Sequence, residues 1–69
     1  MIDVKKLRKV IRQKGSSPRL LSKQIGVDTS TLYRRFNNNG KDFTIAEAKA
    51  ISDALKLSNK EFRSIFFAE

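Results

Sequence analysis

Cysteine and histidine are both absent from the sequence, and acidic residues number only seven. Without cysteine there is no disulfide and no thiolate nucleophile, and without either residue every zinc pattern built on them is excluded. The lack of histidine also removes the usual general base near neutral pH. No apolar run approaches the ~20 residues of a membrane span, and the N-terminus lacks the apolar stretch of a signal peptide. These absences predict an intracellular, soluble protein with no metal, no cofactor and no membrane contact.

The length of 69 residues predicts one small domain over residues 1–69. Its 39% of apolar residues, with five phenylalanines among them, is enough for a compact core. A chain of this size has no room for both a scaffold and a deep catalytic cleft. We therefore predict no enzymatic activity, since the acids Asp28, Glu47 and Glu61 are better explained as partners of helix caps.

Positive charge is unevenly distributed along the chain. Residues 1–41 carry eleven basic and two acidic side chains, whereas residues 42–69 carry four basic and five acidic ones. The net charge of +8 and the pI near 10.3 favour a polyanionic partner. The first part of the chain thus has the charge of a binding face and the second that of a neutral support. The alternative is a soluble surface that is basic in general.

Five residues of the types that cap helix N-termini predict where five short helices begin. The residues expected to cap the helix starts are Asp3, Ser17, Asp28, Thr44 and Ser58. Two of these starts also fit the capping box, in which a hydroxyl residue is followed three positions later by glutamate: Thr44-Ile45-Ala46-Glu47 and Ser58-Asn59-Lys60-Glu61. Pro18 directly follows its cap, and proline is well suited to the first position of a helix.

Apolar periodicity predicts the helix faces and no convincing strand. The first helix should run to about Lys14 and stop at Gly15, the second should stop at Gly26, and the turn residues 37–40 should end the third. The residues predicted to face the core are Val4, Leu7, Val10, Ile11, Leu21, Ile25, Leu32, Phe36, Ile45, Ala48, Ile51, Leu55, Phe62, Ile65 and Phe66. The sequence therefore predicts an all-α, compact five-helix bundle.

Residues 18–36 predict two short helices that cross each other. The turn between them, Ile25-Gly26-Val27-Asp28, is too short for the helices to run antiparallel, and glycine tolerates the positive φ that such a turn favours. Ser22, four residues before Gly26, has a small side chain that lets the helices approach closely. This arrangement is a helix-turn-helix, whose second helix can enter a major groove. The alternative is an αα-corner within an ordinary bundle.

These residues resemble the small Cro/CI-type repressors of bacteriophages, and within them a type found in phages of Gram-positive bacteria. The segments that carry the resemblance are Leu-Ser-Lys-Gln-Ile-Gly-Val-Asp (21–28), Ser-Thr-Leu-Tyr-Arg-Arg-Phe-Asn-Asn-Asn-Gly (30–40), Asp-Phe-Thr-Ile-Ala-Glu-Ala (42–48) and Ile-Phe-Phe-Ala (65–68). The resemblance covers nearly the full chain. It implies a lambda-repressor-like five-helix fold, operator binding usually as a dimer, and a role in the choice between lysis and lysogeny in the cytoplasm of a bacterial host.

Two positions depart from that family. Pro18 stands where many relatives have a glutamine that often holds a phosphate, so this contact must be replaced or lost. Arg35 stands where many relatives are apolar, and Phe36 takes the buried role one residue later.

The outer face of the third helix carries the candidate base contacts. A rotation of about 100° per residue puts three side chains opposite the buried Leu32 and Phe36: Ser30, Arg34 and Asn37. The resemblance implies base contacts at Thr29, Ser30, Tyr33 and Arg34. Arg34 is the strongest candidate, because a guanidinium can pair with guanine O6 and N7 in a bidentate way. The alternatives are a solvated Arg34, a half-buried Tyr33 that only packs, and hydroxyls at 29 and 30 that only belong to a first turn.

Candidate phosphate contacts flank that helix. Ser17 and the free N–H groups of the following turn form an anion site, although Pro18 removes one N–H there. The other candidates are Arg19, Lys23, Arg35, Asn39 and Lys41. For each of these residues taken alone, the alternative is a solvated side chain that makes no phosphate contact. Four basic residues of the first helix add general attraction to DNA: Lys5, Lys6, Lys9 and Arg12.

The function predicted from these patterns is sequence-specific, double-stranded DNA binding by a transcription regulator. Phe67 lies outside the core stripe of the fifth helix, so it is a candidate dimer contact, with packing on its own domain as the alternative. A second candidate function is a helix-turn-helix module that binds a protein, such as an antitoxin or adaptor. The end of the chain directly after the fifth helix suits a complete Cro-like protein or the N-terminal domain of a longer repressor.

Overall fold

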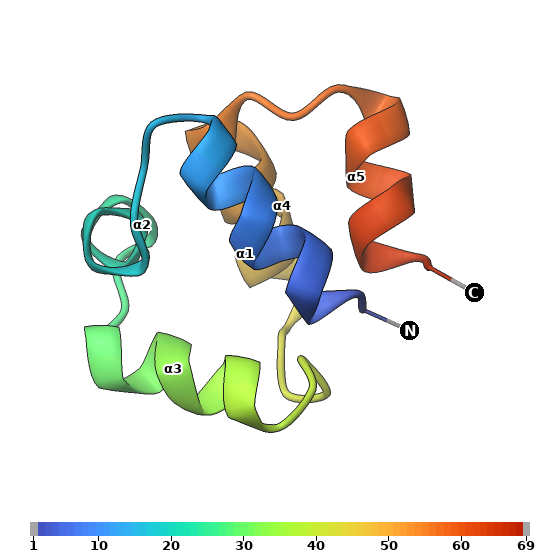
Figure 1. The fold of residues 1–69 in the computed structure, drawn as a ribbon. Coiled ribbons are helices and arrows are strands. Elements are labelled where there is room, and N and C mark those ends of the chain that lie inside the picture. The colour runs from blue at the N-terminus through green and yellow to red at the C-terminus, as the bar shows by residue number, and fades with distance from the viewer. Residues whose placement is uncertain (1, 69) are drawn as a thin grey trace.

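Five helices make up the part of the chain that the computed structural model describes, residues 2–68. They are α1 (Val4–Gln13), α2 (Pro18–Ile25), α3 (Thr29–Asn37), α4 (Ile45–Leu55) and α5 (Asn59–Phe66). Figure 1 shows α4 behind α1, with α2 and α5 on either side, and α3 set apart below them. These residues contain no strand, so the predicted all-α, five-helix class is confirmed.

Side-chain caps form at four of the five predicted helix starts. Asp3 accepts a hydrogen bond from the Lys6 N–H and Ser17 accepts one from the Leu20 N–H, at 3.0 and 3.1 Å. Both capping boxes are complete, with reciprocal bonds of 2.9 to 3.1 Å at α4 and α5. Each cap satisfies N–H groups that have no partner within the helix.

The cap predicted at Asp28 is wrong. Asp28 occupies the position before α3, but its side chain makes no capping hydrogen bond and the residue is exposed. The third position of this helix is Thr31, which cannot reach back as glutamate does in a capping box. The start of α3 is held instead by a contact of Thr29 with α2, described below.

The core confirms the predicted apolar faces with one exception. The buried apolar residues are Leu7, Val10, Ile11, Leu21, Leu32, Phe36, Ala48, Ile51, Leu55, Ile65 and Phe66, with Val4, Ile25 and Phe62 packed at their edge. Ile45, which was expected to face inward, is 90% exposed. The first turn of α4 projects beyond the core, and Phe43 fills that end instead. Its ring lies 6.2 Å from the ring of Phe36 and 6.5 Å from that of Phe66.

The start of α1 and the end of α5 lie side by side, as Figure 1 shows at its right. The Asp3 N–H donates to the Ile65 carbonyl at 2.8 Å, so a backbone hydrogen bond joins the two ends of the bundle. No helix within residues 2–68 has both the length and the hydropathy needed to cross a membrane.

The two capping boxes lead to a first testable prediction. Thr44→Ala and Ser58→Ala should each lower the free energy of unfolding by ~0.5–2 kcal/mol, because each leaves a helix N–H without its acceptor. Urea unfolding followed by circular dichroism measures the change, and Ser58→Asp, which keeps an acceptor, is the control. DNA affinity of the folded protein should hardly change in Ser58→Ala, since α5 lies away from α3. Loss of DNA binding by folded Ser58→Ala would contradict the supporting role given to α5.

Candidate nucleic-acid interface

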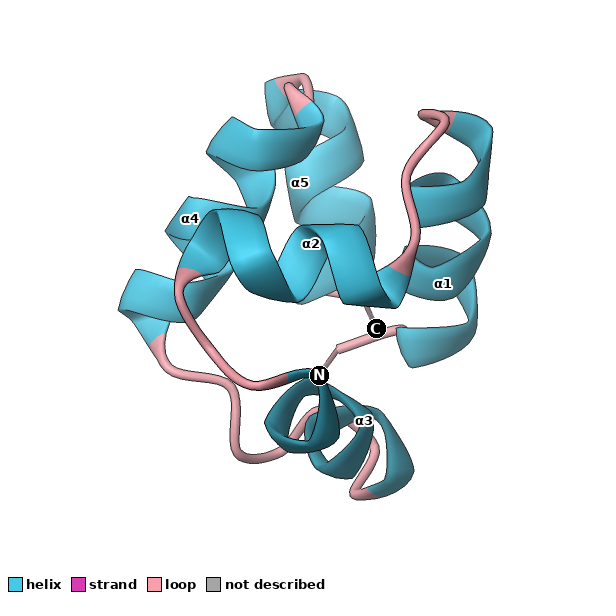
Figure 2. Ribbon diagram, turned by 90° about the vertical axis from the view of Figure 1, so that its left-hand side faces the viewer, coloured by secondary structure: helices cyan, strands magenta, loops and turns pink. Residues whose placement is uncertain are grey.

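A left-handed glycine makes the turn between α2 and α3. Gly26 has φ +79° and ends α2, its N–H donating to the Ser22 carbonyl. The next N–H, from Val27, donates to the same carbonyl at 3.0 Å. Figure 1 views α2 nearly along its axis and α3 from the side, and Figure 2 shows the reverse. The two helices therefore cross steeply, as the helix-turn-helix prediction requires.

A buried hydroxyl pair fixes this crossing. The Ser22 side chain is buried, and its hydroxyl donates to the Arg19 carbonyl at 2.7 Å. Its oxygen also lies 2.8 Å from Thr29 Oγ1. Because a serine hydroxyl has only one hydrogen, Thr29 must be the donor in this second bond. Thr29 is half-buried and holds the first turn of α3 against α2. A base contact by Thr29 stays a prediction, and it would have to use the methyl group or share this hydroxyl.

The outer face of α3 points away from the other helices (Figure 1). Ser30, Arg34 and Asn37 are exposed, while Leu32 and Phe36 on the opposite face are buried. Arg34 Nη2 donates to Thr31 Oγ1 at 3.2 Å, within its own helix. The orientation predicted from helical geometry is thus confirmed, and the guanidinium of Arg34 lies at the surface.

One flank of α3 is tied to α4 by an ion pair. Arg35 Nη2 lies 3.1 Å from Glu47 Oε2, both side chains are partly buried, and Arg35 Nε is buried without a partner among the described residues. Burial alone would raise the pKa of Glu47, but hydrogen bonds from Arg35 and from the Thr44 N–H outweigh it and lower the pKa. The hydrogen bond to Glu47 raises the pKa of Arg35. The pairing leaves fewer N–H groups of Arg35 for the predicted phosphate contact.

The other flank carries Tyr33, which both packs and remains accessible. Its ring meets that of Phe36 edge-on at 6.1 Å, yet the residue is 40% exposed. The guanidinium carbon of Arg8, on α1, lies 6.0 Å from the centre of the Tyr33 ring and 5.4 Å from that of Phe36. Sequence reasoning missed Arg8, because no periodicity within α1 indicates which residue of α3 it will meet.

The remaining candidate phosphate contacts lie around α3. Arg19 and Lys23 are exposed on α2, and Asn39 and Lys41 are exposed in the turn that follows α3. Ser17 is exposed, but its hydroxyl oxygen already caps α2. These side chains thus belong to the helix before α3 and to the turn after it, and their contacts with phosphate stay predictions. Among the described residues, no three acidic side chains come together as metal ligands.

The comparison with protein families agrees with this geometry. A family model described as helix-turn-helix (HTH_3) matches residues 4–62, from the start of α1 into α5. The chain belongs to this helix-turn-helix family, a family of DNA-binding regulators with a lambda-repressor-like fold. Comparison with curated proteins and with solved structures gave no match.

The Arg35–Glu47 pair leads to a prediction about acid stability. The lowered pKa of Glu47 means that the folded state binds this proton less tightly than the unfolded chain, so stability is present above the ordinary pKa of 4.5. It should be lost as the pH falls below that ordinary value and through the lowered pKa of the folded state. Glu47→Gln keeps a side chain that can serve the capping box but removes the charge, so it should be less stable at pH 7 and lose less stability in acid. Urea unfolding across this range measures both effects.

The control is Asp53→Asn, which removes the same charge from the exposed side of α4. This variant should keep the acid sensitivity of the parent protein. If Glu47→Gln and the parent lose equal stability in acid, the ion pair does not stabilise the fold.

Proposed function

We propose that the chain is a phage Cro/CI-like repressor, a transcription regulator that inserts α3 into the major groove of a palindromic operator. The observation that carries the proposal is the position of α3. Its inner face is held by Leu32 and Phe36 in the core, and its outer face presents Ser30 and Arg34 to solvent. A rigid helix with a polar outer face is what a major groove admits.

Each exposed side chain of α3 then has a task suited to its chemistry. The Arg34 guanidinium donates to O6 and N7 of a guanine, and the Ser30 hydroxyl donates to or accepts from a base edge. Tyr33 contacts a thymine methyl or a phosphate from its half-exposed flank. Cations near the ends of α3 contact phosphates and set the register of the domain on the duplex. This function needs no metal and no cofactor.

A second copy of the chain completes the operator complex. One recognition helix reads only a few base pairs, and two-fold pairing doubles that number while requiring a palindromic site. Phe67 is 67% exposed at the end of α5, with one edge against Phe62 at a ring distance of 5.9 Å. We place the dimer contact there, because this helix is set apart from α3 and carries an exposed aromatic ring.

The experiment that tests the proposed function is selection of bound sequences from a random DNA pool. We expect a palindrome with half-sites roughly 34 Å apart and binding at least ~1,000-fold tighter than to random DNA. The affinity should fall steeply with salt, since phosphate contacts release counterions. Selection without any enriched sequence would contradict the proposal and favour a module that binds a protein.

The dimer contact gives a further prediction. Phe67→Asp should leave the protein helical and able to bind a half-site, but should reduce its affinity for the full palindrome to that for a half-site. The added charge makes burial of this position in a dimer unfavourable. Electrophoretic mobility shifts on full and half sites measure the difference, and Phe67→Leu, which stays apolar, is the control.

Inserting five base pairs between the half-sites should have the same effect on the parent protein, because it turns one half-site to the opposite face of the duplex. If Phe67→Asp binds the full site as tightly as the parent, the dimer contact lies elsewhere.

A further inference from the structure

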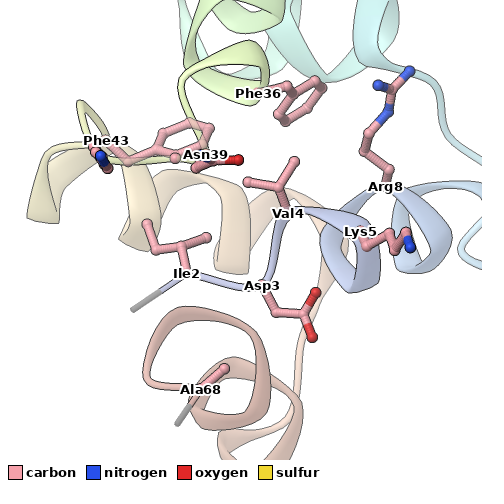
Figure 3. A pocket seen from close by; sticks show the side chains of 11 residues that line it. Ile2, Asp3, Val4, Lys5, Arg8, Phe36, Asn39, Phe43 and Ala68 are labelled. Atoms are coloured by element: carbon pink, nitrogen blue, oxygen red, sulfur yellow. The ribbon is translucent and has the colours of Figure 1, made fainter.

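Arg8 lies where α1 meets the flank of α3, outside the helix-turn-helix itself. Its guanidinium carbon is 5.4 Å from the Phe36 ring and 6.0 Å from the Tyr33 ring. Both distances are within the range of a cation–π contact, in which a guanidinium lies over the face of an aromatic ring. Figure 3 shows the side chain of Arg8 extending from α1 past Phe36 toward α3. Two rings of α3 therefore hold a cation of α1 beside the recognition helix.

The N–H groups of Arg8 have no protein partner within residues 2–68. The side chain makes no hydrogen bond and no ion pair there, and the residue is exposed. A cation–π contact uses none of the hydrogen bonds of a guanidinium, so the N–H donors of Arg8 stay free to bind an anion. Arg35 on the opposite flank differs, because its Nη2 is paired with Glu47 of α4 at 3.1 Å. Of these two arginines on the flanks of α3, Arg35 is paired with a carboxylate within residues 2–68 and Arg8 is not.

The charges around Arg8 favour an anion. Arg8 borders an open hollow of about 980 Å³ between α1, the end of α3 and the following turn, and Lys5 and Lys41 line the same hollow (Figure 3). The only carboxylate among its lining residues is Asp3, which caps α1 by accepting the Lys6 N–H. Three cations and one carboxylate, which is already engaged, give the lining of this hollow a net positive charge.

We propose that Arg8 binds a phosphate of the DNA backbone on the α1 side of the recognition helix, and that Tyr33 and Phe36 hold it in place for this contact. The proposal rests on the proposed function, since it requires α3 to lie in a groove. Arg8 is then a DNA-contacting residue supplied by α1. It also gives Tyr33 a second task, the support of a neighbouring phosphate contact, beside any contact of its own.

The test uses the selected operator with single phosphates neutralised by methylphosphonate substitution. For the parent protein, neutralising the phosphate that Arg8 contacts should weaken binding roughly tenfold, the size of one charge-assisted hydrogen bond. Arg8→Ala removes this contact from both half-sites, so it should bind the unmodified operator roughly 100-fold more weakly than the parent and should be insensitive to neutralisation of that phosphate. The slope of log K against log salt concentration should be shallower by about 1.8, or about 0.9 for each half-site. Lys9→Ala is the matched control, because it removes one exposed charge from another side of α1 and should keep the full phosphate profile.

Two variants of Tyr33 test the support by the rings. Tyr33→Phe keeps an aromatic face and should keep the sensitivity at the Arg8 phosphate, whereas Tyr33→Leu removes that face and should reduce this sensitivity. If Tyr33 acted only through its hydroxyl, the two variants would show equal losses instead, because both lack the hydroxyl.

A measurement without DNA tests the contact between Arg8 and the Tyr33 ring. The chain has one tyrosine and no tryptophan, so its intrinsic fluorescence reports on Tyr33 alone. Arg8→Ala should change this emission and shift the Tyr33 ring signals in NMR spectra, while Lys9→Ala should not. Circular dichroism verifies that both variants fold, and Arg8→Lys, which keeps the charge but not the planar stacking group, should restore only part of the phosphate sensitivity.

The outcomes separate this proposal from the one on which it rests. If the parent protein prefers no DNA sequence, the repressor function and the Arg8 contact both fail. If the parent binds selectively and Arg8→Ala keeps its phosphate profile and salt dependence, the Arg8 contact alone is wrong.

Discussion

Arg34→Ala should weaken binding to the selected operator by about 1–3 kcal/mol and relax the preference at one base pair of each half-site. The side chain is exposed on the outer face of α3, and its one hydrogen bond within residues 2–68 goes to Thr31 of the same helix. Its removal should therefore leave the fold unchanged and affect recognition alone. Competition binding with operators changed at single positions measures the loss, and circular dichroism verifies the fold.

The control for Arg34 is Lys23→Ala, an exposed cation of α2. A phosphate contact there carries no sequence information, so its loss should weaken binding to every sequence by a similar factor and flatten the salt dependence. The role of Arg34 in base recognition is wrong if Arg34→Ala lowers the affinity for operator and random DNA equally.

Leu21→Ala should lower the free energy of unfolding by ~2–5 kcal/mol. Leu21 is fully buried on α2, where it packs in the core shared with Leu32 of α3. A domain of this length has a total stability of roughly 3–10 kcal/mol, so the variant should be partly unfolded at 25 °C. Urea or thermal unfolding followed by circular dichroism measures the effect, and DNA affinity should fall with the folded fraction.

The adjacent Leu20 provides a matched control. It has the same side chain on the same helix, but it is 47% exposed. Leu20→Ala should cost less than about 1 kcal/mol, since truncation at the surface leaves no cavity. Equal destabilisation by the two variants would show that α2 does not pack through the face that Leu21 occupies.

The helices and their inner faces were predictable because they depend on local signals. A cap such as Ser17 is read within four residues of chain, and a stripe such as Leu7, Val10 and Ile11 within two turns. The predicted burial of Ile45 was wrong because periodicity tells which residues share a stripe, but not where the neighbouring elements end. The predicted side-chain cap at Asp28 was wrong because the residue type indicates a cap without showing where the carboxylate will point.

The outer face of α3 was predictable for the same local reason, whereas its flanks were not. The Arg35–Glu47 pair joins residues twelve positions apart in two helices. The Ser22–Thr29 bond depends on how steeply α2 and α3 cross, and the place of Arg8 depends on how α1 packs on both. Each of these contacts depends on how whole helices pack against one another. The sequence pattern of a single helix does not predict that packing.

The separation of the two faces of α3 has a consequence for how such a domain can change over time. Ser30, Arg34 and Asn37 are exposed, and their side chains make no hydrogen bond or ion pair with another helix within residues 2–68. In the proposed operator complex, replacing them would alter which sequence is read without opening a cavity in the core or unpairing Glu47. New target sites would then arise by substitutions that are nearly neutral for folding, and these three positions are where a library for altered specificity should be randomised.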